Sequence, residues 1–174
     1  MQAQPHLRDA TPDDLPAILA IYNDAVANTT AIWNETIVDL DNRRAWMAER
    51  NAAGFPVLVA ETEGQVAGYA TYGLWRPHDG FRHTVEHSVY VAADARGQGF
   101  GEALLRALIE RARSDGLHVM VGAIDASNAG SIALHRKLGF EGAGVVPQVG
   151  AKFGRWLDLA FLALRLDDQP EPPR

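Results

Sequence analysis

One segment of six residues constrains the fold and chemistry of this chain more than any other. It lies in the second half of the chain and reads Arg96-Gly-Gln-Gly-Phe-Gly. An apolar segment at 85–92 precedes them, and leucine and isoleucine at helical spacing follow, so the pattern predicts strand, turn and helix. The three glycines leave backbone N–H groups uncovered by side chains. A helix that begins here adds unpartnered N–H groups and the positive end of its dipole. The segment therefore predicts a phosphate or pyrophosphate site.

The spacing of the glycines separates the known kinds of phosphate turn. A nucleotide P-loop ends in Gly-Lys-Ser/Thr, whereas Gly101 is followed by Glu102 and Ala103. A dinucleotide fingerprint has G-x-G-x-x-G spacing after the first strand, and this turn lies past mid-chain. The pattern that fits is Arg/Gln-x-x-Gly-x-Gly/Ala, at Arg96, Gly99 and Gly101. A glycine-rich strand–helix turn without a ligand is the alternative interpretation of the six residues alone.

Length and composition limit the classes of protein that remain. The 174 residues predict one domain at 1–166, followed by a flexible tail at 167–174 that holds three prolines. The chain has no cysteine, which excludes disulfides and thiolate metal sites and fits a cytoplasmic location. No apolar run approaches the ~20 residues of a membrane span. The net charge of −6, without a basic patch, argues against nucleic acid as a partner.

Periodicity and turn signals give an order of elements. Helices are expected at 11–28, 39–53, 101–115 and 127–138, from apolar stripes with capping residues and closing glycines. Strands are expected at 6–8, 55–61, 66–75, 84–92, 117–124, 140–149 and 152–166, the last two divided by a turn at Gly150. The order β-α-α-β-β-β-α-β-α-β-β predicts one α/β domain of layered α+β type.

This order and several stretches resemble the GCN5-related N-acetyltransferases (GNAT) over residues 7–166. The similarity is greatest to the phosphinothricin and methionine sulfoximine N-acetyltransferase branch. The stretches that carry it include Thr84-Val-Glu-His-Ser-Val-Tyr-Val, Leu134-His-Arg-Lys-Leu-Gly-Phe and Lys152-Phe-Gly-Arg-Trp-Leu-Asp. The resemblance implies the GNAT fold, a mixed, mostly antiparallel twisted sheet flanked by helices. It also implies acetyl-CoA as co-substrate.

The resemblance places acetyl-CoA along the strand and the glycine turn. The pyrophosphate would accept hydrogen bonds from N–H groups of the turn and first helical residues, namely Gly97, Gln98, Gly99, Phe100, Gly101 and Glu102. The strand edge at Val89, Tyr90 and Val91 would pair with the two amides of the pantetheine arm. The same backbone would place an N–H near the thioester oxygen, where negative charge develops.

Three further side chains have two interpretations each. Arg96 either pairs with phosphate or begins the loop. Asn128 contacts the CoA arm, caps the next helix, or does both. Lys137 either reaches a phosphate or is an ordinary solvated helix lysine.

An amine attacks a thioester only as the free base, so the reaction needs a proton acceptor. The resemblance assigns this role to Glu86, which otherwise is a carboxylate at the rim that pairs with Arg82. His135 lies where many acetyltransferases place the acid that protonates the departing thiolate, and a buried, hydrogen-bonded histidine is the alternative. Strand alternation puts Glu86 and His87 on opposite faces, although the family usually has a bulge there. His83 and His87 lack a third ligand, so no metal is expected.

The expected substrate is a small amino acid, which needs a cation for its carboxylate. Arg76 is the predicted anchor, and Arg155 and Lys152 are secondary anchors. The remaining predicted substrate contacts are Trp33, Pro77, His78, Phe81, Glu86, His87 and Ser88. Trp75 and Phe153 could extend the wall. His78 stands where close relatives often have an aromatic residue, so side-chain preference is open.

Direct transfer in a ternary complex is the expected mechanism, because no cysteine is available to carry an acyl group and Ser88 has no triad pattern. Expected substrates are phosphinothricin, methionine sulfoximine and methionine sulfone. Acetylation of a peptide N-terminus, lysine or antibiotic, and a non-catalytic CoA-binding module, are the alternatives. Relatives of this branch form dimers, so a homodimer through 140–166 is expected.

Overall fold

The protein, described by a computed structural model for residues 5–173, is built on one seven-stranded sheet. The strand order is β1-β2-β3-β4-β5-β7-β6, and all neighbours are antiparallel except β4 and β5. The strands are β1 (His6–Asp9), β2 (Val57–Thr62), β3 (Gln65–Leu74), β4 (Thr84–Val91), β5 (Val119–Asp125), β6 (Glu141–Lys152) and β7 (Arg155–Arg165). The predicted fold class and element order are confirmed.

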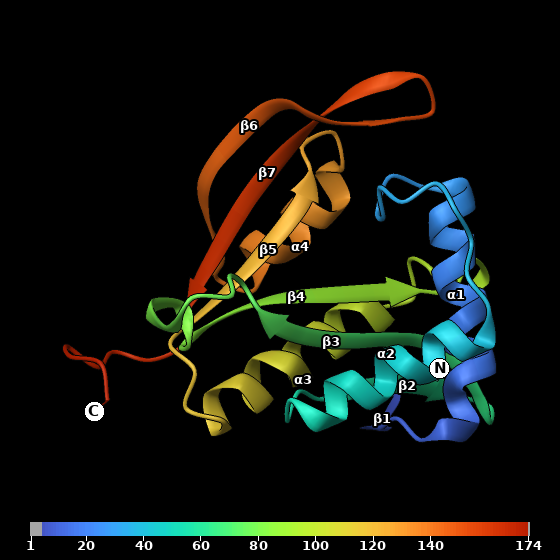
Figure 1. The fold of residues 1–174 in the computed structure, drawn as a ribbon, viewed down its shortest axis with the longest axis horizontal. Helices are drawn as coiled ribbons and strands as arrows, with labels where there is room; N and C mark the ends of the chain where they lie inside the picture. The colour runs from blue at the N-terminus through green and yellow to red at the C-terminus, as the bar shows by residue number, and fades with distance from the viewer. Residues whose placement is uncertain (1–4, 174) are drawn as a thin grey trace.

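Two pairs of helices cover the two faces of the sheet (Figure 1). They are α1 (Leu15–Asn28), α2 (Leu40–Ala52), α3 (Phe100–Ser114) and α4 (Ala129–Lys137). Apolar residues of α1 and α2 pack with Val57, Val59 and Tyr69 of the sheet. Residues of α3 pack on the opposite face with Leu58, Ala70 and Val85. Neighbouring residues of one strand thus contribute to different cores, as strand alternation requires.

The helix ends follow local capping rules. Thr11 and Asp14 form a capping box around a single 3-10 turn, Pro12–Asp14, from which α1 continues. The side chain of Asp39 accepts a hydrogen bond from the N–H of Asn42 and caps α2. No helix in residues 5–173 has both the length and the apolar character that crossing a membrane requires.

The predicted turn at Gly150 is wrong. β6 continues through Gly150 to Lys152, and the two-residue turn is Phe153-Gly154. Both turn residues have positive φ, 51° and 72°, which suits the twist of a tight hairpin. The irregularity nearer Gly150 is a bulge instead, since the register between β6 and β7 shifts between Val146 and Gly150.

The parallel pair β4–β5 separates soon after it begins. Pairing covers only Thr84–Glu86 on β4 and 119–121 on β5. Beyond Glu86, β4 remains paired with β3 as far as Val91, while β5 remains paired with β7 as far as Asp125. The two strands diverge in Figure 1, with β4 running below and β5 rising away from it. The sheet is therefore split at its centre.

Candidate active site

A cleft of about 1070 Å³ occupies the split between β4 and β5. Its size is at the upper end of the ~300–1,000 Å³ typical of small-molecule sites. One side is formed by β4 and the glycine turn, another by the end of β5 and α4, and a third by the segment after α1. Predicted site residues that line it are Trp33, Glu86, His87, Ser88, Val89, Tyr90, Val91, Arg96, Gly97, Gly99, Phe100, Gly101, Glu102, Asn128 and His135.

The glycine turn has the geometry expected of an anion site. Gly97 and Gly99 have φ of 76° and 92°, a backbone region that side chains disfavour. Gly99 is the N-cap of α3, and its carbonyl accepts the N–H of Ala103. The N–H groups that precede Ala103 therefore have no partner within the helix. A Cβ built on Gly101 would lie 3.6 Å from Val91 and 3.9 Å from Leu134, between β4 and α4. The bare backbone thus borders the cleft.

The side chains around this turn are partly engaged with one another. Arg96 pairs with Asp24 at 2.6 Å, so α1 holds its guanidinium beside the turn. Lys137 pairs with Glu102 at 2.7 Å and lies outside the lining of the cleft. The side chain of Gln98 also lies outside the lining and donates to the carbonyl of Asp94. Basic charge is present near the turn, but it is neutralised by carboxylates from α1 and α3.

Asn128 caps α4, as one of its two interpretations predicted. Its Oδ1 accepts the N–H of Ser131 at 3.0 Å, while the residue also lines the cleft. The hydrogen bond to Oδ1 fixes the orientation of the amide, and the NH₂ group of the same side chain remains available to a ligand. The capping interpretation is confirmed, and contact with the CoA arm stays a prediction.

Glu86 lies where the strands part. The ladder between β3 and β4 runs without a register shift from Val85 to Val91, so the bulge implied by the resemblance is absent from it. By alternation Glu86, Ser88 and Tyr90 face α1 and α2, whereas His87 faces α4. Burial raises the pKa of Glu86, and the positive charge of Arg76 acts against this rise. A carboxyl group with a raised pKa is a stronger base than an exposed carboxyl group and is suited to accept a proton.

His87 and His135 form a buried pair on the α4 side of the cleft. Their rings stack with centroids 4.9 Å apart, and Phe140 meets both rings edge-on. Nδ1 of His135 lies 2.7 Å from the carbonyl oxygen of Ser131, and its Nε2 lies 2.9 Å from Nε2 of His87. Both ring nitrogens of His135 are thus engaged.

These contacts fix where the protons lie. A carbonyl oxygen can only accept, so Nδ1 of His135 carries a proton, and in the neutral ring its Nε2 accepts one from His87. Nδ1 of His87 is then unprotonated, and this acceptor is buried without a hydrogen-bond partner among the described residues. Burial, with the charge of His135, lowers the pKa of His87 to about 3. The pair is neutral near pH 7, and His135 can donate to a thiolate only if one of its bonds breaks.

The predicted substrate loop lies at the surface, outside the lining of the cleft. The guanidinium carbon of Arg76 lies 4.6 Å from the centre of the Trp75 ring, and the guanidinium donates a hydrogen bond to the backbone carbonyl of Trp75. Pro77 and His78 are exposed, and Phe81 packs edge-on against Trp75. Of the predicted substrate contacts, Trp33, Glu86, His87 and Ser88 border the cleft, while these loop residues do not.

Two predictions of secondary anchors meet different outcomes. Lys152 is 2% exposed and donates to three backbone carbonyls, so its expected role as a carboxylate anchor is wrong. Arg155 is exposed on β7 and is not part of the cleft lining.

Sequence reasoning missed the wall formed by Thr29, Thr30, Ala31 and Ile32, and it missed Asp125 at the end of β5. The irregular stretch Thr29-Thr-Ala-Ile-Trp-Asn-Glu between the first two helices was the available signal for that wall. Residues 5–173 contain no group of three His, Asp or Glu side chains placed for a metal ion.

A family model described as the acetyltransferase (GNAT) family matches residues 18–140. The chain belongs to this family. The protein is therefore an acetyl-CoA-dependent N-acetyltransferase.

Relatives share nearly the whole length of this GNAT chain. A Pseudomonas paraeruginosa protein named L-methionine sulfoximine/L-methionine sulfone acetyltransferase is 65% identical over 168 residues, 96% of this chain and 98% of the relative. The structure of yncA from Salmonella typhimurium, solved with its cofactor acetyl-CoA, has a TM-score of 0.95 and 53% identity, and the match covers 98% of this chain and 99% of that one. A Brucella melitensis structure described as ribosomal-protein-alanine N-acetyltransferase has a TM-score of 0.91 and 62% identity, with coverage of 92% and 99%.

Proposed function

We propose that the protein acetylates the amino group of a small amino acid of the methionine sulfoximine, methionine sulfone or phosphinothricin kind. The observation that carries this proposal is the cleft, in which the glycine turn lies beyond the end of β4 and Glu86 lies at the point where β4 and β5 separate. The 65% identity to a methionine sulfoximine/sulfone acetyltransferase over nearly the whole chain supports the substrate class.

The residues fit acetyl-CoA along β4. Beyond Glu86 the edge of β4 no longer pairs with β5, so the backbone of Val89, Tyr90 and Val91 is available to the pantetheine amides. The N–H groups at the start of α3 face the cleft and would hold the pyrophosphate. Bound acetyl-CoA supplies an acetyl group activated as a thioester. The turn and the strand edge hold it in line with Glu86.

Glu86 accepts the proton of the attacking amine, directly or through one water. Its raised pKa, caused by burial, makes it a stronger base than an exposed glutamate. Arg76 binds the substrate carboxylate when the surface loop that carries it folds over the α1 side of the cleft. Its charge already acts on Glu86, which places the two groups within electrostatic reach. Transfer is direct, because the chain has no cysteine and Ser88 has no histidine bonded to its hydroxyl in the described residues.

His135 is the proposed proton donor to the departing thiolate, and this role requires a change at the histidine pair. The single proton of the neutral ring is on Nδ1 and is used by Ser131, so donation requires either release of Ser131 or loss of the His87 bond with uptake of a proton at Nε2. The alternative is that the pair remains neutral and only positions β4 against α4. The two roles predict different kinetics for substitutions at position 135.

An acetyl-CoA consumption screen over amino acids tests the substrate proposal. Methionine sulfoximine, methionine sulfone and phosphinothricin should give the highest kcat/KM, with unmodified amino acids as comparison. Turnover confined to amines without an α-carboxylate would contradict it.

Acetylation of a protein N-terminus is the second candidate. It is favoured by the 62% identity to the Brucella protein described as a ribosomal-protein-alanine N-acetyltransferase. The same screen should therefore include a peptide with N-terminal alanine. A peptide kcat/KM above that of methionine sulfoximine would favour this candidate.

We propose a homodimer through the β6–β7 hairpin, and a cytoplasmic enzyme that confers resistance to these amino-acid toxins. β6 is an edge strand, and the hairpin exposes the apolar side chains Val145, Val146, Val149, Phe153 and Trp156. An exposed apolar edge of this kind normally has a partner. Light scattering should give twice the chain mass, and Trp156→Glu should reduce it to the mass of one chain. A monomeric wild type would contradict the dimer.

A further inference from the structure

The segment that follows α1 forms one wall of the cleft without regular secondary structure. Residues Thr29, Thr30, Ala31, Ile32 and Trp33 all line the cleft, on the face toward which Glu86 points. Trp33 donates its indole N–H to the carbonyl of Thr30 within the segment. Such a segment needs contacts from elsewhere to keep one conformation. We call residues 29–33 the α1 wall.

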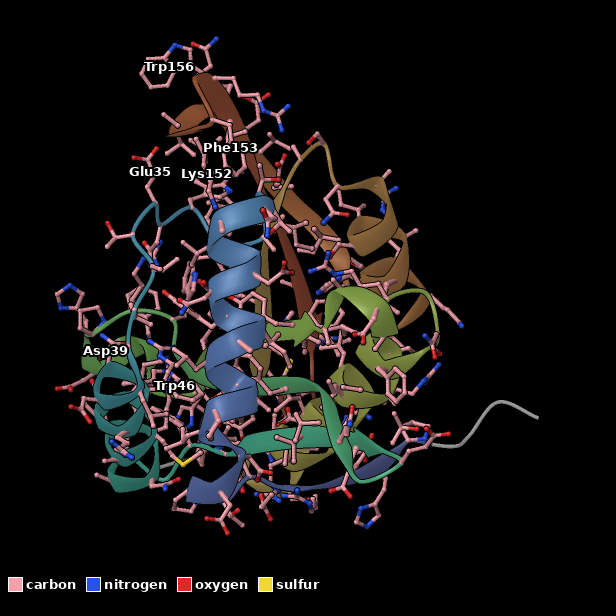
Figure 2. The ribbon with its side chains drawn as sticks, turned by 90° about the vertical axis from the view of Figure 1, so that its right-hand side faces the viewer. Glu35, Asp39, Trp46, Lys152, Phe153 and Trp156 are labelled. Atoms are coloured by element: carbon pink, nitrogen blue, oxygen red, sulfur yellow. The ribbon has the colours of Figure 1, made fainter. Side chains whose placement is uncertain are left out.

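Lys152, at the end of β6, supplies the first of these contacts. Its Nζ lies 2.5 to 2.7 Å from the carbonyl oxygens of Val26, Thr29 and Ile32. An ammonium group has three N–H donors, and all three are used here. The residue is 2% exposed, and Figure 2 shows it at the end of α1. One buried side chain thus joins the last turn of α1 to two points of the wall.

The charge of Lys152 suits this place. The C-terminal end of a helix carries partial negative charge and unpaired carbonyls, which a lysine can satisfy. Burial lowers the pKa of Lys152, and the negative charge of Glu35 opposes this. Phe153 adds its ring 4.9 Å from the ammonium. An apolar side chain of similar length would fill the space and leave three carbonyls without a donor.

Gly150 supplies the second contact. A Cβ built on Gly150 would lie 2.2 Å from two ring carbons of Trp33. The indole of Trp33 therefore packs directly on the backbone of β6, and only glycine permits this approach. Two residues of the hairpin, two positions apart on β6, hold two different parts of the wall.

A bulge gives the end of the hairpin its register. Val146 pairs with Leu159 and Gly150 pairs with Leu157, so residues 147–149 on β6 oppose a single residue of β7. The N–H of Gln148, at φ 52°, donates to the carboxylate of Asp158 across this bulge. Bulges bend and twist the strand that carries them. Beyond the bulge, the hairpin reaches over the end of α1 (Figure 1).

We propose that the end of the β6–β7 hairpin positions the amine-binding side of the active site, with Lys152 and Gly150 as positioning residues that hold the α1 wall. The proposal rests on the proposed function only in calling this side the amine side. The pyrophosphate contacts lie at the glycine turn, outside the reach of either residue. Loss of either residue should therefore weaken amine binding and spare acetyl-CoA binding.

Two substitutions and one control test this inference. Lys152→Met removes the ammonium group and keeps the length of the side chain. Gly150→Ala displaces Trp33 and leaves the bonds of Lys152 in place. Gly142→Ala is the matched control, because it lies on the same strand and a Cβ there meets nothing within 4 Å. Each variant is characterised by acetyl-CoA Kd from calorimetry, by KM and kcat with methionine sulfoximine, and by hydrogen exchange of residues 26–33.

Both test variants should raise the amine KM at least tenfold, with acetyl-CoA Kd within twofold of wild type. Exchange at residues 26–33 should accelerate at least tenfold, while Gly142→Ala matches wild type throughout. An unchanged amine KM in folded Gly150→Ala, or equal losses of amine and acetyl-CoA binding, would overturn the proposal. If Lys152→Met does not fold, Gly150→Ala decides alone. A wild type that is inactive on methionine sulfoximine would contradict the proposed function. The positioning of the α1 wall would still be tested, because hydrogen exchange and acetyl-CoA Kd are measured without the amine.

Discussion

Nε2 of His87 and Nε2 of His135 lie 2.9 Å apart and join strand β4 to helix α4 at the point where the sheet splits. A Cβ on Gly122 would lie 3.0 to 3.2 Å from these rings, so glycine at that position leaves room for the pair. The next register position after Glu86–Val121 would be His87–Gly122. The pair thus occupies the place where β4 and β5 stop being neighbours.

The histidine pair makes stability depend on pH. Because the pKa of His87 falls to about 3 in the folded protein, the unfolded chain binds more protons below about pH 6.5, and stability decreases as pH falls. His87→Phe should remove this contribution. Urea unfolding at pH 7 and pH 5 should show the wild type losing roughly 1–2 kcal/mol more than the variant over this interval. An equal pH dependence in both proteins would show that His87 is not buried as a neutral group.

His135→Phe distinguishes the two roles of the pair. It leaves the Nε2–H of His87 buried without an acceptor, which should cost about 1–3 kcal/mol of unfolding free energy. If His135 donates the proton to the thiolate, kcat should also fall, and the variant should lack the decline of kcat at alkaline pH that loss of the donated proton causes in the wild type. If the pair only positions β4, the stability loss should occur with kcat within a few-fold of wild type. Denaturant unfolding and a pH–rate profile of the variant measure both quantities.

Glu86→Gln should keep acetyl-CoA affinity and lower turnover by about 10²–10⁴-fold, the usual contribution of a general base. Burial raises the pKa of Glu86, so wild-type kcat/KM should fall as pH decreases through that pKa and the base becomes protonated. The variant should lack this limb. Unchanged turnover, with chemistry shown to be rate-limiting, would remove Glu86 from the mechanism.

Gly101→Val should weaken acetyl-CoA binding by more than tenfold, measured by calorimetry. The new side chain would project between Val91 and Leu134, the place where β4 and α4 border the cleft. The helix itself tolerates valine, with a cost below about 1 kcal/mol relative to other ordinary residues. An unchanged melting temperature without ligand serves as the control. Normal affinity would refute the assignment of this turn to the pyrophosphate.

Arg76→Ala should raise the amine KM by more than it raises the KM for acetyl-CoA. A guanidinium matches a carboxylate in geometry and charge, and Arg76 already acts on Glu86 electrostatically. Arg82→Ala provides the comparison, since Arg82 lies in the same loop and donates to the carbonyl of Asp79. Steady-state kinetics with both substrates varied measure the two constants. Equal, small effects on both would remove Arg76 as the anchor.

Local sequence determined most of the fold and the conformation of the glycine turn. Capping by Thr11, Asp39 and Asn128 depends on residues three apart, and the positive φ at Gly97 and Gly99 depends on the residues themselves. The element order followed from periodicity in the same way. The hairpin turn was misplaced because Gly150 is a better turn residue than Phe153 by composition. Gly150 instead allows Trp33, from a distant part of the chain, to pack directly on the backbone of β6.

The side-chain roles in the cleft were decided by tertiary structure alone. Lys152 meets its carbonyl partners up to 126 positions earlier, His135 meets His87 across 48 positions, and Arg96 meets Asp24 across 72. A sequence shows that a lysine or histidine can bind a substrate. Whether its donors and acceptors remain free depends on which distant backbone and side-chain groups packing brings within 3 Å.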